Sequence, residues 1–257
     1  MNLPDKAVIA CIHLLPTPGS PRYGGDVDAI YERALREAEV FLREGADALL
    51  VENAGDLPFY PQAVPAETVA MMAGVTREIV RSSSVPVGVA VLRNDAHAAV
   101  AVAVAAGARF VRVNVHAGAV LAAQGMLTGS SHETMRLRRT LQADVAVLAD
   151  AGVKHSQPFA YPDLATEVRD LTGLADGIIV SGELTGLETA PEDLIAARSR
   201  TKGPVYVGSG VTPDNVGRVR DHADGFIVGS YFKVDGLAAN PVDEGRVQQF
   251  MKSLGRG

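Results

Sequence analysis

The sequence predicts an α/β fold, a single (β/α)8 TIM barrel domain with a parallel eight-stranded core that spans residues 1–257. Three observations predict it. Short, continuously apolar segments alternate with longer amphipathic ones, and the alternation recurs about every 31 residues, the size of one βα unit. The longest connections all follow strands. Strands without a polar face are typical of parallel sheets, which other elements cover on both sides.

Eight segments have the length and composition of barrel strands. Amphipathic helical patterns separate them, and in VDAIYERALREAEVFLREG the apolar residues recur three and four apart. Asp95 is predicted to cap the helix after the third strand. The alternative, a doubly wound open sheet, is disfavoured because no GxGxxG motif follows the first strand. The strand segments are residues 7–14, 45–53, 85–92, 107–116, 145–155, 175–182, 203–210 and 223–230.

Loop lengths orient the predicted barrel. Connections from helix to strand are short, whereas three connections from strand to helix are long: LLPTPGSPRYGG, NAGDLPFYPQAVP and AGAVLAAQGMLTG. Active sites of such barrels lie at the carboxyl ends of the strands, where these loops would gather. We therefore expect the functional site at that face.

Composition and charge exclude several classes of partner. The formal net charge is −6 without a long basic run, which argues against nucleic acid. The most apolar run, residues 98–108, is far shorter than the roughly 20 residues that cross a bilayer, so we expect no transmembrane segment. Cys11 is the only cysteine, which fits a reducing cytoplasm and a core position. A homo-oligomer is compatible with these features.

Two glycine turns follow the last two predicted strands, where (β/α)8 barrels frequently bind phosphate. Glycine lets backbone N–H groups approach an anion, and a short helix over residues 230–233 would point its N-terminus at it. The alternative is tight turns that need glycine backbone angles. We expect the turns to bind the phosphate of a small-molecule ligand through Gly208, Ser209, Gly210, Gly229 and Ser230.

The fourth strand segment, FVRVNVH, alternates apolar and polar residues although helices should cover its outer side. Its polar residues must therefore face the barrel interior. Arg112 would lie deepest, with Asn114 and His116 nearest the mouth as catalytic candidates. A buried structural network is the alternative, most plainly for Arg112.

The fifth strand segment ends in DAGVKH, where alternation puts Asp150 and Lys154 on one side. Lys154 would bind a substrate anion, act as a desolvated base or form a Schiff base. An ordinary ion pair between Asp150 and Lys154 is the alternative. His155 has the opposite parity and ranks lower.

Acidic residues and a histidine end other strands. Glu52 is a candidate general acid or base, or a magnesium ligand together with Asp56 or Asp150. No motif with metal-ligand spacing is present, so a divalent metal is possible but not required. His13 and Glu183 each lie one residue beyond an apolar run and are expected at the mouth.

Long collinear motifs resemble one known family over almost the whole chain. They are IHLLPTPGSPRYGG, ENAGDLPFYPQAVPAET, VGVAVLRNDA, VRVNVHAGA, LADAGVKH, VGSGVTPDN and ADGFIVGSYFKVDG. These segments are similar to the BtpA/SgcQ family, whose members are regarded as TIM-barrel-like. The resemblance implies two kinds of function, because the namesake is linked to photosystem I stability while other members look like enzymes of sugar-phosphate operons. Ala151 and Gly152 depart from the bulkier pair that the family favours.

Two function hypotheses follow. The first is an enzyme that acts on a sugar phosphate or nucleotide by isomerase, lyase or glycosyl-transfer chemistry, with Lys154, Glu52, Asn114, His116 and Asp150 as the catalytic set. The second is a non-catalytic factor for assembly or stability of photosystem I or another membrane complex. A polar barrel mouth favours the first hypothesis, because a scaffold does not need one.

Overall fold

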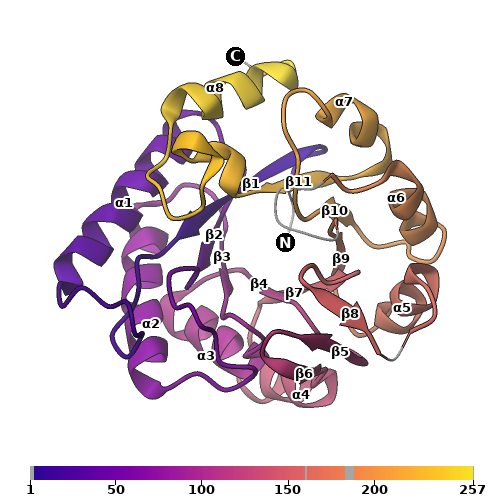
Figure 1. Ribbon diagram of the computed structural model, residues 1–257, viewed down its shortest axis with the longest axis horizontal. Helices are drawn as coiled ribbons and strands as arrows, with labels where there is room; N and C mark the ends of the chain where they lie inside the picture. Colours follow the sequence, from indigo (N-terminus) through magenta and orange to yellow (C-terminus); the bar gives the residue numbers. More distant parts are fainter. Residues whose placement is uncertain (1–2, 160, 183–187, 257) are drawn as a thin grey trace.

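The computed structural model describes residues 3–159, 161–182 and 188–256, and its central feature is a closed barrel (Figure 1). In these ranges eight parallel strands pair in the order β1-β11-β10-β9-β7-β4-β3-β2, and β2 returns to β1. The predicted (β/α)8 architecture is thereby confirmed. The barrel strands are β1 (Ala7–His13), β2 (Ala48–Glu52), β3 (Val87–Ala90), β4 (Phe110–Val113), β7 (Ala146–Ala151), β9 (Gly177–Val180), β10 (Val205–Val207) and β11 (Gly225–Val228).

Helices surround the barrel on its outer side (Figure 1). Within the described ranges, no helix is both long and apolar enough to cross a membrane. The α-helices are α1 (Val27–Arg43), α2 (Ala66–Ser82), α3 (Ala96–Ala106), α4 (Ser131–Thr140), α5 (Leu164–Leu171), α6 (Pro191–Arg198), α7 (Val216–Val219) and α8 (Glu244–Ser253). Short 3-10 segments are η1 (Arg220–His222), η2 (Ser230–Phe232) and η3 (Val234–Gly236), so the helix expected after Gly229 is a single 3-10 turn.

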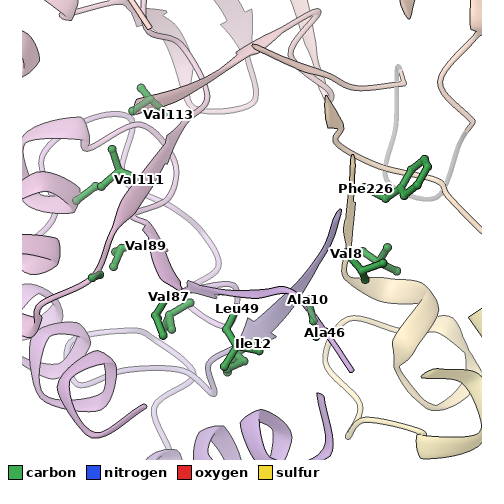
Figure 2. Close-up of a cluster of buried hydrophobic side chains, with 14 of the residues drawn as sticks. Val8, Ala10, Ile12, Ala46, Leu49, Val87, Val89, Val111, Val113 and Phe226 are labelled. Carbon is green, nitrogen blue, oxygen red and sulfur yellow. The ribbon is translucent and has the colours of Figure 1, made fainter. Parts of the chain in front are cut away.

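Strand alternation divides the core into two layers. Val8 and Ile12 of β1 point outward and pack with helix residues such as Phe41, in the cluster of which Figure 2 shows a part. Ile9 and Cys11 point inward, into a second cluster formed by strand residues. Each strand buries both faces, which explains its continuous apolar sequence.

The amino-terminal part of the barrel interior is filled by apolar side chains. Phe110 of β4 is fully buried there, beside Gly88 of β3. A Cβ atom on Gly88 would lie 2.2 Å from the Phe110 ring, so only glycine leaves room for that ring. Polar residues begin one inward position further along the strands, which confines the polar site to the carboxyl end.

The segment AGAVLAAQGMLTG, expected as a long loop from strand to helix, has regular secondary structure of its own. It contains the hairpin β5 (Ala119–Ala122) and β6 (Gly125–Thr128), and β8 (Ser156–Pro158) adds to β5 as a third antiparallel strand. Gly125, with φ of +95°, supplies the turn. Alternation points Val120 and Leu127 to one side, where they are buried in a small cluster with Val115 and Val153.

The predicted cap of α3 is confirmed. One carboxylate oxygen of Asp95 accepts the N–H of Ala98 at 2.8 Å. The other accepts the N–H of Val64 at 2.9 Å and so ties the long loop after β2 to the start of α3. An N-cap of this kind satisfies an otherwise unpaired helical N–H.

Candidate functional site

A cavity of about 200 Å³ opens at the carboxyl ends of the barrel strands. Strands β1, β2 and β4 and the segment after β7 contribute polar side chains to it. The turns after β10 and β11 complete its wall, so the site lies on the face that the loop lengths predicted. The polar side chains from these strands and this segment are Cys11, His13, Glu52, Arg112 and Lys154, and Thr212, Tyr231 and Arg246 also line the cavity. The turn residues include Gly208, Ser209, Gly210, Gly229 and Ser230.

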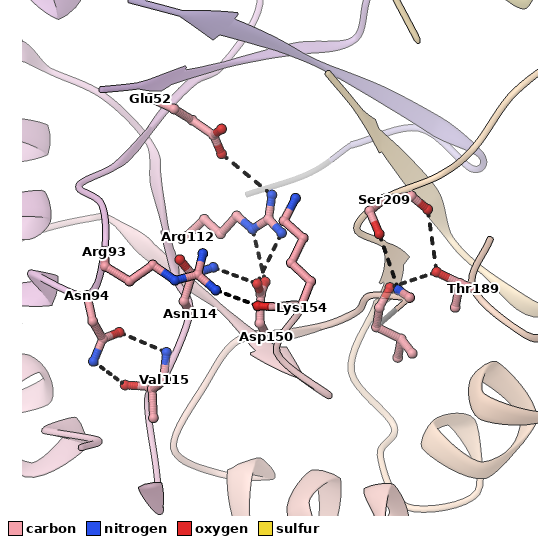
Figure 3. A network of polar contacts seen from close by, with 12 residues as sticks. Glu52, Arg93, Asn94, Arg112, Asn114, Val115, Asp150, Lys154, Thr189 and Ser209 are labelled. Carbon is pink, nitrogen blue, oxygen red and sulfur yellow. Dashed lines mark hydrogen bonds and ion pairs between the residues drawn. The ribbon is translucent and has the colours of Figure 1, made fainter. Parts of the chain in front are cut away.

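A buried network centred on Arg112 forms one side of the cavity (Figure 3). Arg112 binds Asp150 through two hydrogen bonds, Nε to Oδ1 at 2.9 Å and Nη2 to Oδ2 at 3.0 Å. Asn114 donates to Oδ2 of Asp150 at 2.6 Å. Glu52 completes the network, with Oε1 3.5 Å from Nη1 of Arg112. Burial alone would lower the pKa of Arg112, but Asp150 and Glu52 outweigh it and raise the pKa, so the guanidinium stays charged.

Lys154 lies apart from this network although it faces the same cavity. Both oxygens of Asp150 already accept hydrogen bonds from Arg112 and Asn114. The Lys154 ammonium makes no hydrogen bond or ion pair with any described residue, so the alternative of an Asp150–Lys154 ion pair is not what the structure has. Burial and then Arg112 lower the pKa of Lys154, while Glu52 and Asp150 oppose them.

The backbone conformation that presents Lys154 differs from the one the sequence suggested. β7 ends at Ala151, and Gly152 has φ of +67°, so strand alternation does not carry the side chain to the mouth. Arg93 instead holds this segment, because its Nη2 donates to the Lys154 carbonyl oxygen at 2.5 Å. Asn94 holds the neighbouring segment by pairing with both backbone groups of Val115.

The glycine turns present backbone N–H groups beside the cavity, with one exception. The N–H of Gly208 donates to Val180 O at 2.8 Å and is not available to a ligand. The N–H groups of Ser209, Gly210, Gly229 and Ser230 donate to no described residue. A Cβ on Gly208 would lie 2.4 Å from Ile179 Cγ2 and 3.4 Å from Arg112 Nη2, so glycine allows the close approach of this turn to the barrel interior.

The inward face of β1 contributes two residues to the same cavity. His13 was expected at the mouth, whereas Cys11 was interpreted as a core residue. His13 Nε2 lies 3.6 Å from Glu52 Oε2. Burial and the charge of Lys233 lower the pKa of His13 to about 3, so its ring is neutral near pH 7. The signal for this pair was available in the sequence, because Cys11 and His13 are two positions apart on one strand.

Several predicted residues do not join the cavity. The placement of His116 at the mouth is wrong: the chain bends at Asn114 and again at His116, so alternation ends, and His116 Nε2 lies 2.9 Å from Leu174 O. Asp56 contacts Thr17 and Asn53 rather than Glu52. His155 lines a separate cavity of about 1020 Å³ beside β8 and α5. Glu183 lies outside the described residues.

The site combines cationic and acidic groups in a small buried volume. Its basic residues and unpaired N–H groups suit an anion, and Glu52 lies close enough to exchange protons with a ligand held there. Soft and neutral donors, the Cys11 sulfur and the His13 imidazole, lie on the same side as Glu52.

Comparison with solved structures identifies similar barrels. Phosphoribosylanthranilate isomerase from Pyrococcus furiosus superposes with a TM-score of 0.61 at 16% identity, over 97% of this chain and 98% of that one. Thiamine phosphate pyrophosphorylase from the same organism gives a TM-score of 0.59 at 15% identity, over 97% and 95% of the two chains. At these identities the likeness establishes the fold.

Comparison of sequences identifies closer relatives. The photosystem I biogenesis protein BtpA of Synechocystis is 44% identical over 97% of this chain and 88% of its own length. An uncharacterized protein of Pyrococcus furiosus is 40% identical over 94% of this chain and 92% of its own. The model of the BtpA family matches residues 4–256. The chain therefore belongs to the BtpA family.

Proposed function

We propose that this protein is an enzyme that acts on a phosphorylated small molecule, a sugar phosphate or a nucleotide, by isomerase, lyase or glycosyl-transfer chemistry. One observation carries the proposal. A single cavity at the carboxyl ends of the strands joins two glycine turns with unpaired N–H groups to Glu52, Arg112 and Lys154.

In this proposal the turns hold the phosphate group. Four N–H donors, those of Ser209, Gly210, Gly229 and Ser230, border the cavity, and Arg112 adds a fixed positive charge. Backbone N–H groups of glycine turns form anion-binding concavities of this kind. The proposed site does not depend on the dipole of an α-helix, because short 3-10 segments follow Gly229.

Lys154 and Glu52 act at the reacting end of the substrate. Lys154 lacks a carboxylate at contact distance among the described residues, so its charge is available to stabilise negative charge that develops on the substrate. Glu52 moves the proton. Asn114 and Asp150 fix the Arg112 side chain from behind and are positioning residues.

The solved structures of similar fold support a phosphorylated ligand by analogy alone. One of them is phosphoribosylanthranilate isomerase in complex with reduced 1-(o-carboxyphenylamino)-1-deoxyribulose 5-phosphate. Its barrel covers 97% of this chain at a TM-score of 0.60. The analogy agrees with the position of the glycine turns after β10 and β11.

A second candidate function is a non-catalytic role in the assembly or stability of photosystem I or another membrane complex. The name of the 44% identical Synechocystis relative favours it. This role does not require a charged cavity with unpaired N–H donors, and that is why we rank it second.

Thermal unfolding with a panel of pentose phosphates, nucleoside monophosphates and inorganic phosphate tests the proposal. A ligand at 100 times its dissociation constant adds about 2.7 kcal/mol to the free energy of unfolding. In Gly229→Ala the new Cβ would lie 3.0 Å from the His13 ring and narrow the cavity, so the ligand-induced shift should fall. Gly217→Ala is the matched control, because its Cβ meets no atom within 4 Å.

Two outcomes would contradict the enzyme hypothesis. The first is that no ligand of the panel raises the unfolding temperature of the wild-type protein. The second is that Gly229→Ala shows the same ligand-induced rise as the wild type. A blank panel would favour the second candidate function, which the panel does not measure.

A further inference from the structure

Three side chains of different chemistry meet on the β1–β2 side of the cavity. Cys11 and His13 are successive inward residues of β1, and Glu52 is paired in register with His13 on β2. One sulfur, one ring nitrogen and one carboxylate oxygen from these residues all lie within 4.8 Å of one another. The His13 and Glu52 side chains are only 9% and 10% exposed.

Hydrogen bonding fixes which nitrogen of His13 carries the proton. Nδ1 lies 3.2 Å from the carbonyl oxygen of Ala238, which only accepts hydrogen bonds, so Nδ1 is the donor. With Nδ1 as the donor, Nε2 is the nitrogen that can offer a lone pair to a metal ion. That lone pair faces Glu52 Oε2 at 3.6 Å, and Nε2 makes no hydrogen bond to a described residue. Two acceptors facing each other in a buried site attract a cation between them.

The same arrangement is typical of histidine ligands of metals, whose second nitrogen donates to a backbone carbonyl or a carboxylate. A tetrahedral zinc ion with nitrogen and oxygen ligands at about 2.0–2.1 Å and sulfur at about 2.3 Å would hold these atoms about 3.3–3.6 Å apart. The His13–Glu52 distance of 3.6 Å already fits. The Cys11 sulfur lies within 4.8 Å of the other two donor atoms and would have to approach them by up to about 1.2 Å to reach the spacing of a tetrahedral site.

Charge around the site is compatible with a dication. Glu52 and Asp150 are balanced by Arg112 and Lys154, and Arg246 at the cavity wall adds one positive charge. A metal-bound Cys11 thiolate would add one negative charge to this set. A divalent ion more than offsets that charge. The surplus positive charge would face the same cavity as the unpaired N–H groups of the glycine turns and would favour an anionic ligand.

We propose that Cys11, His13 and Glu52 bind one divalent transition-metal ion of the zinc or cobalt class and leave a fourth coordination position open to the cavity. Thiolate and imidazole donors select these ions over magnesium, which prefers oxygen ligands. Three protein ligands with one open position are typical of catalytic rather than structural zinc sites. The metal can be titrated alone, so the test does not depend on the proposed function. With an ion bound, Glu52 would serve as a ligand and not as the group that moves the proton.

Cobalt(II) titration of the full chain, after treatment with a chelator, is the test. We expect one ion per chain, with the visible absorption of a tetrahedral site and a thiolate-to-cobalt charge-transfer band. Cys11→Ser should abolish that band. His13→Ala and Glu52→Gln should each weaken cobalt binding by about 100-fold or more, since even loss of an outer-shell partner costs roughly 10 to 100-fold.

His132→Ala is the matched control, because that side chain is 67% exposed on α4 and should leave the titration unchanged. X-ray absorption of the zinc-loaded wild-type protein provides a measurement without variants and should detect one sulfur neighbour at about 2.3 Å. No stoichiometric binding, a zinc shell without sulfur, or a charge-transfer band that survives in Cys11→Ser would overturn the proposal.

The two proposals fail separately. Stabilisation by phosphorylated ligands without cobalt binding would overturn the metal site and leave the proposed function standing. Cobalt binding without stabilisation by any ligand of the phosphate panel would overturn the proposed function and leave the metal site standing.

Discussion

Lys154 and Lys233 occupy two regions at the carboxyl face of the barrel and differ in one decisive respect. Lys154 is partly buried and Lys233 is fully buried, and burial is the largest influence that lowers the pKa of each. Lys233 is fully buried, and its Nζ lies 2.5 Å from Glu37 Oε2 on α1. Lys154 contacts no carboxylate in the described part of the chain. A buried lysine therefore indicates function only when its charge is not already used by a partner.

The surroundings of the two lysines support this distinction. Lys233 also lies 5.8 Å from the centre of the Phe41 ring, and Glu37 is held on its other oxygen by Arg33 at 2.6 Å. These contacts attach the segment after β11 to α1 and stabilise the barrel wall. Lys154 instead faces a cavity, where a ligand can supply the missing anion.

Lys233→Met should cause the largest effect. It leaves one oxygen of Glu37 buried without its cation, and breaking a buried pair in this way costs about 3–5 kcal/mol. Urea unfolding measures the loss. The double variant Lys233→Met/Glu37→Gln should lose less than the single variant, because no buried charge then lacks a partner. If Lys233→Met lowered the free energy of unfolding by less than about 1 kcal/mol, the structural role assigned to Lys233 would be wrong.

Lys154→Met should have the opposite signature. Loss of one preorganised charge at the reacting end should reduce turnover of a phosphorylated substrate by about 100-fold or more. The free energy of unfolding should change by less than about 1 kcal/mol, because no carboxylate is left unpaired. Steady-state kinetics and urea unfolding of the same samples measure both quantities. Lys202→Met, at an exposed position, is the control, and activity of Lys154→Met within a few-fold of the parent would exclude the catalytic role.

Glu167 extends the comparison to a buried acid that forms no ion pair with a described residue. Its carboxylate accepts the N–H of Gly152 at 3.0 Å, yet burial raises its pKa from 4.5 to about 6. A raised carboxyl pKa favours the protonated form in the folded state. Glu167 therefore contributes about 2 kcal/mol to the free energy of unfolding at pH values below 4.5. This contribution is lost as the pH rises through about 6.

Glu167→Gln should remove this pH dependence. Between pH 4.5 and pH 7 the variant should gain about 1.5 kcal/mol in the free energy of unfolding relative to the wild type. Urea unfolding at a series of pH values measures the difference. Glu32→Gln, on the exposed side of α1, is the control, and its difference from the wild type in the free energy of unfolding should not change with pH. A difference for Glu167→Gln that is likewise independent of pH would contradict the raised pKa.

Local patterns explain why the barrel was predictable from the sequence. Continuous apolar strands, the Asp95 cap and the glycine turns each depend on a few neighbouring residues. Where the chain leaves regular strand geometry, the predictions from strand alternation were less successful. The expected position of His116 is wrong because this residue follows a bend. Lys154 lines the cavity as predicted, but it follows Gly152, whose φ is positive, and not a continuing strand.

Contacts between distant segments were beyond what one sequence reveals. Asp150 contacts Arg112 rather than Lys154, since a guanidinium on the neighbouring strand reaches both of its oxygens. The convergence of Cys11 with Glu52 depends on the register between β1 and β2, which residue spacing does not specify. The packing of β8 on β5 likewise joins two loops that are far apart in the chain.

That small sheet has a consequence for how variants of this fold can be recombined. β8 begins at Ser156, two residues after Lys154, and Ala122 of β5 pairs with it. The loops after the fourth and fifth barrel strands therefore form one exchangeable module. In a chimera with its junction between the two loops, the β8 strand after Lys154 would pair with a β5 strand from a different parent protein. A junction outside residues 110–158 would transfer both loops together.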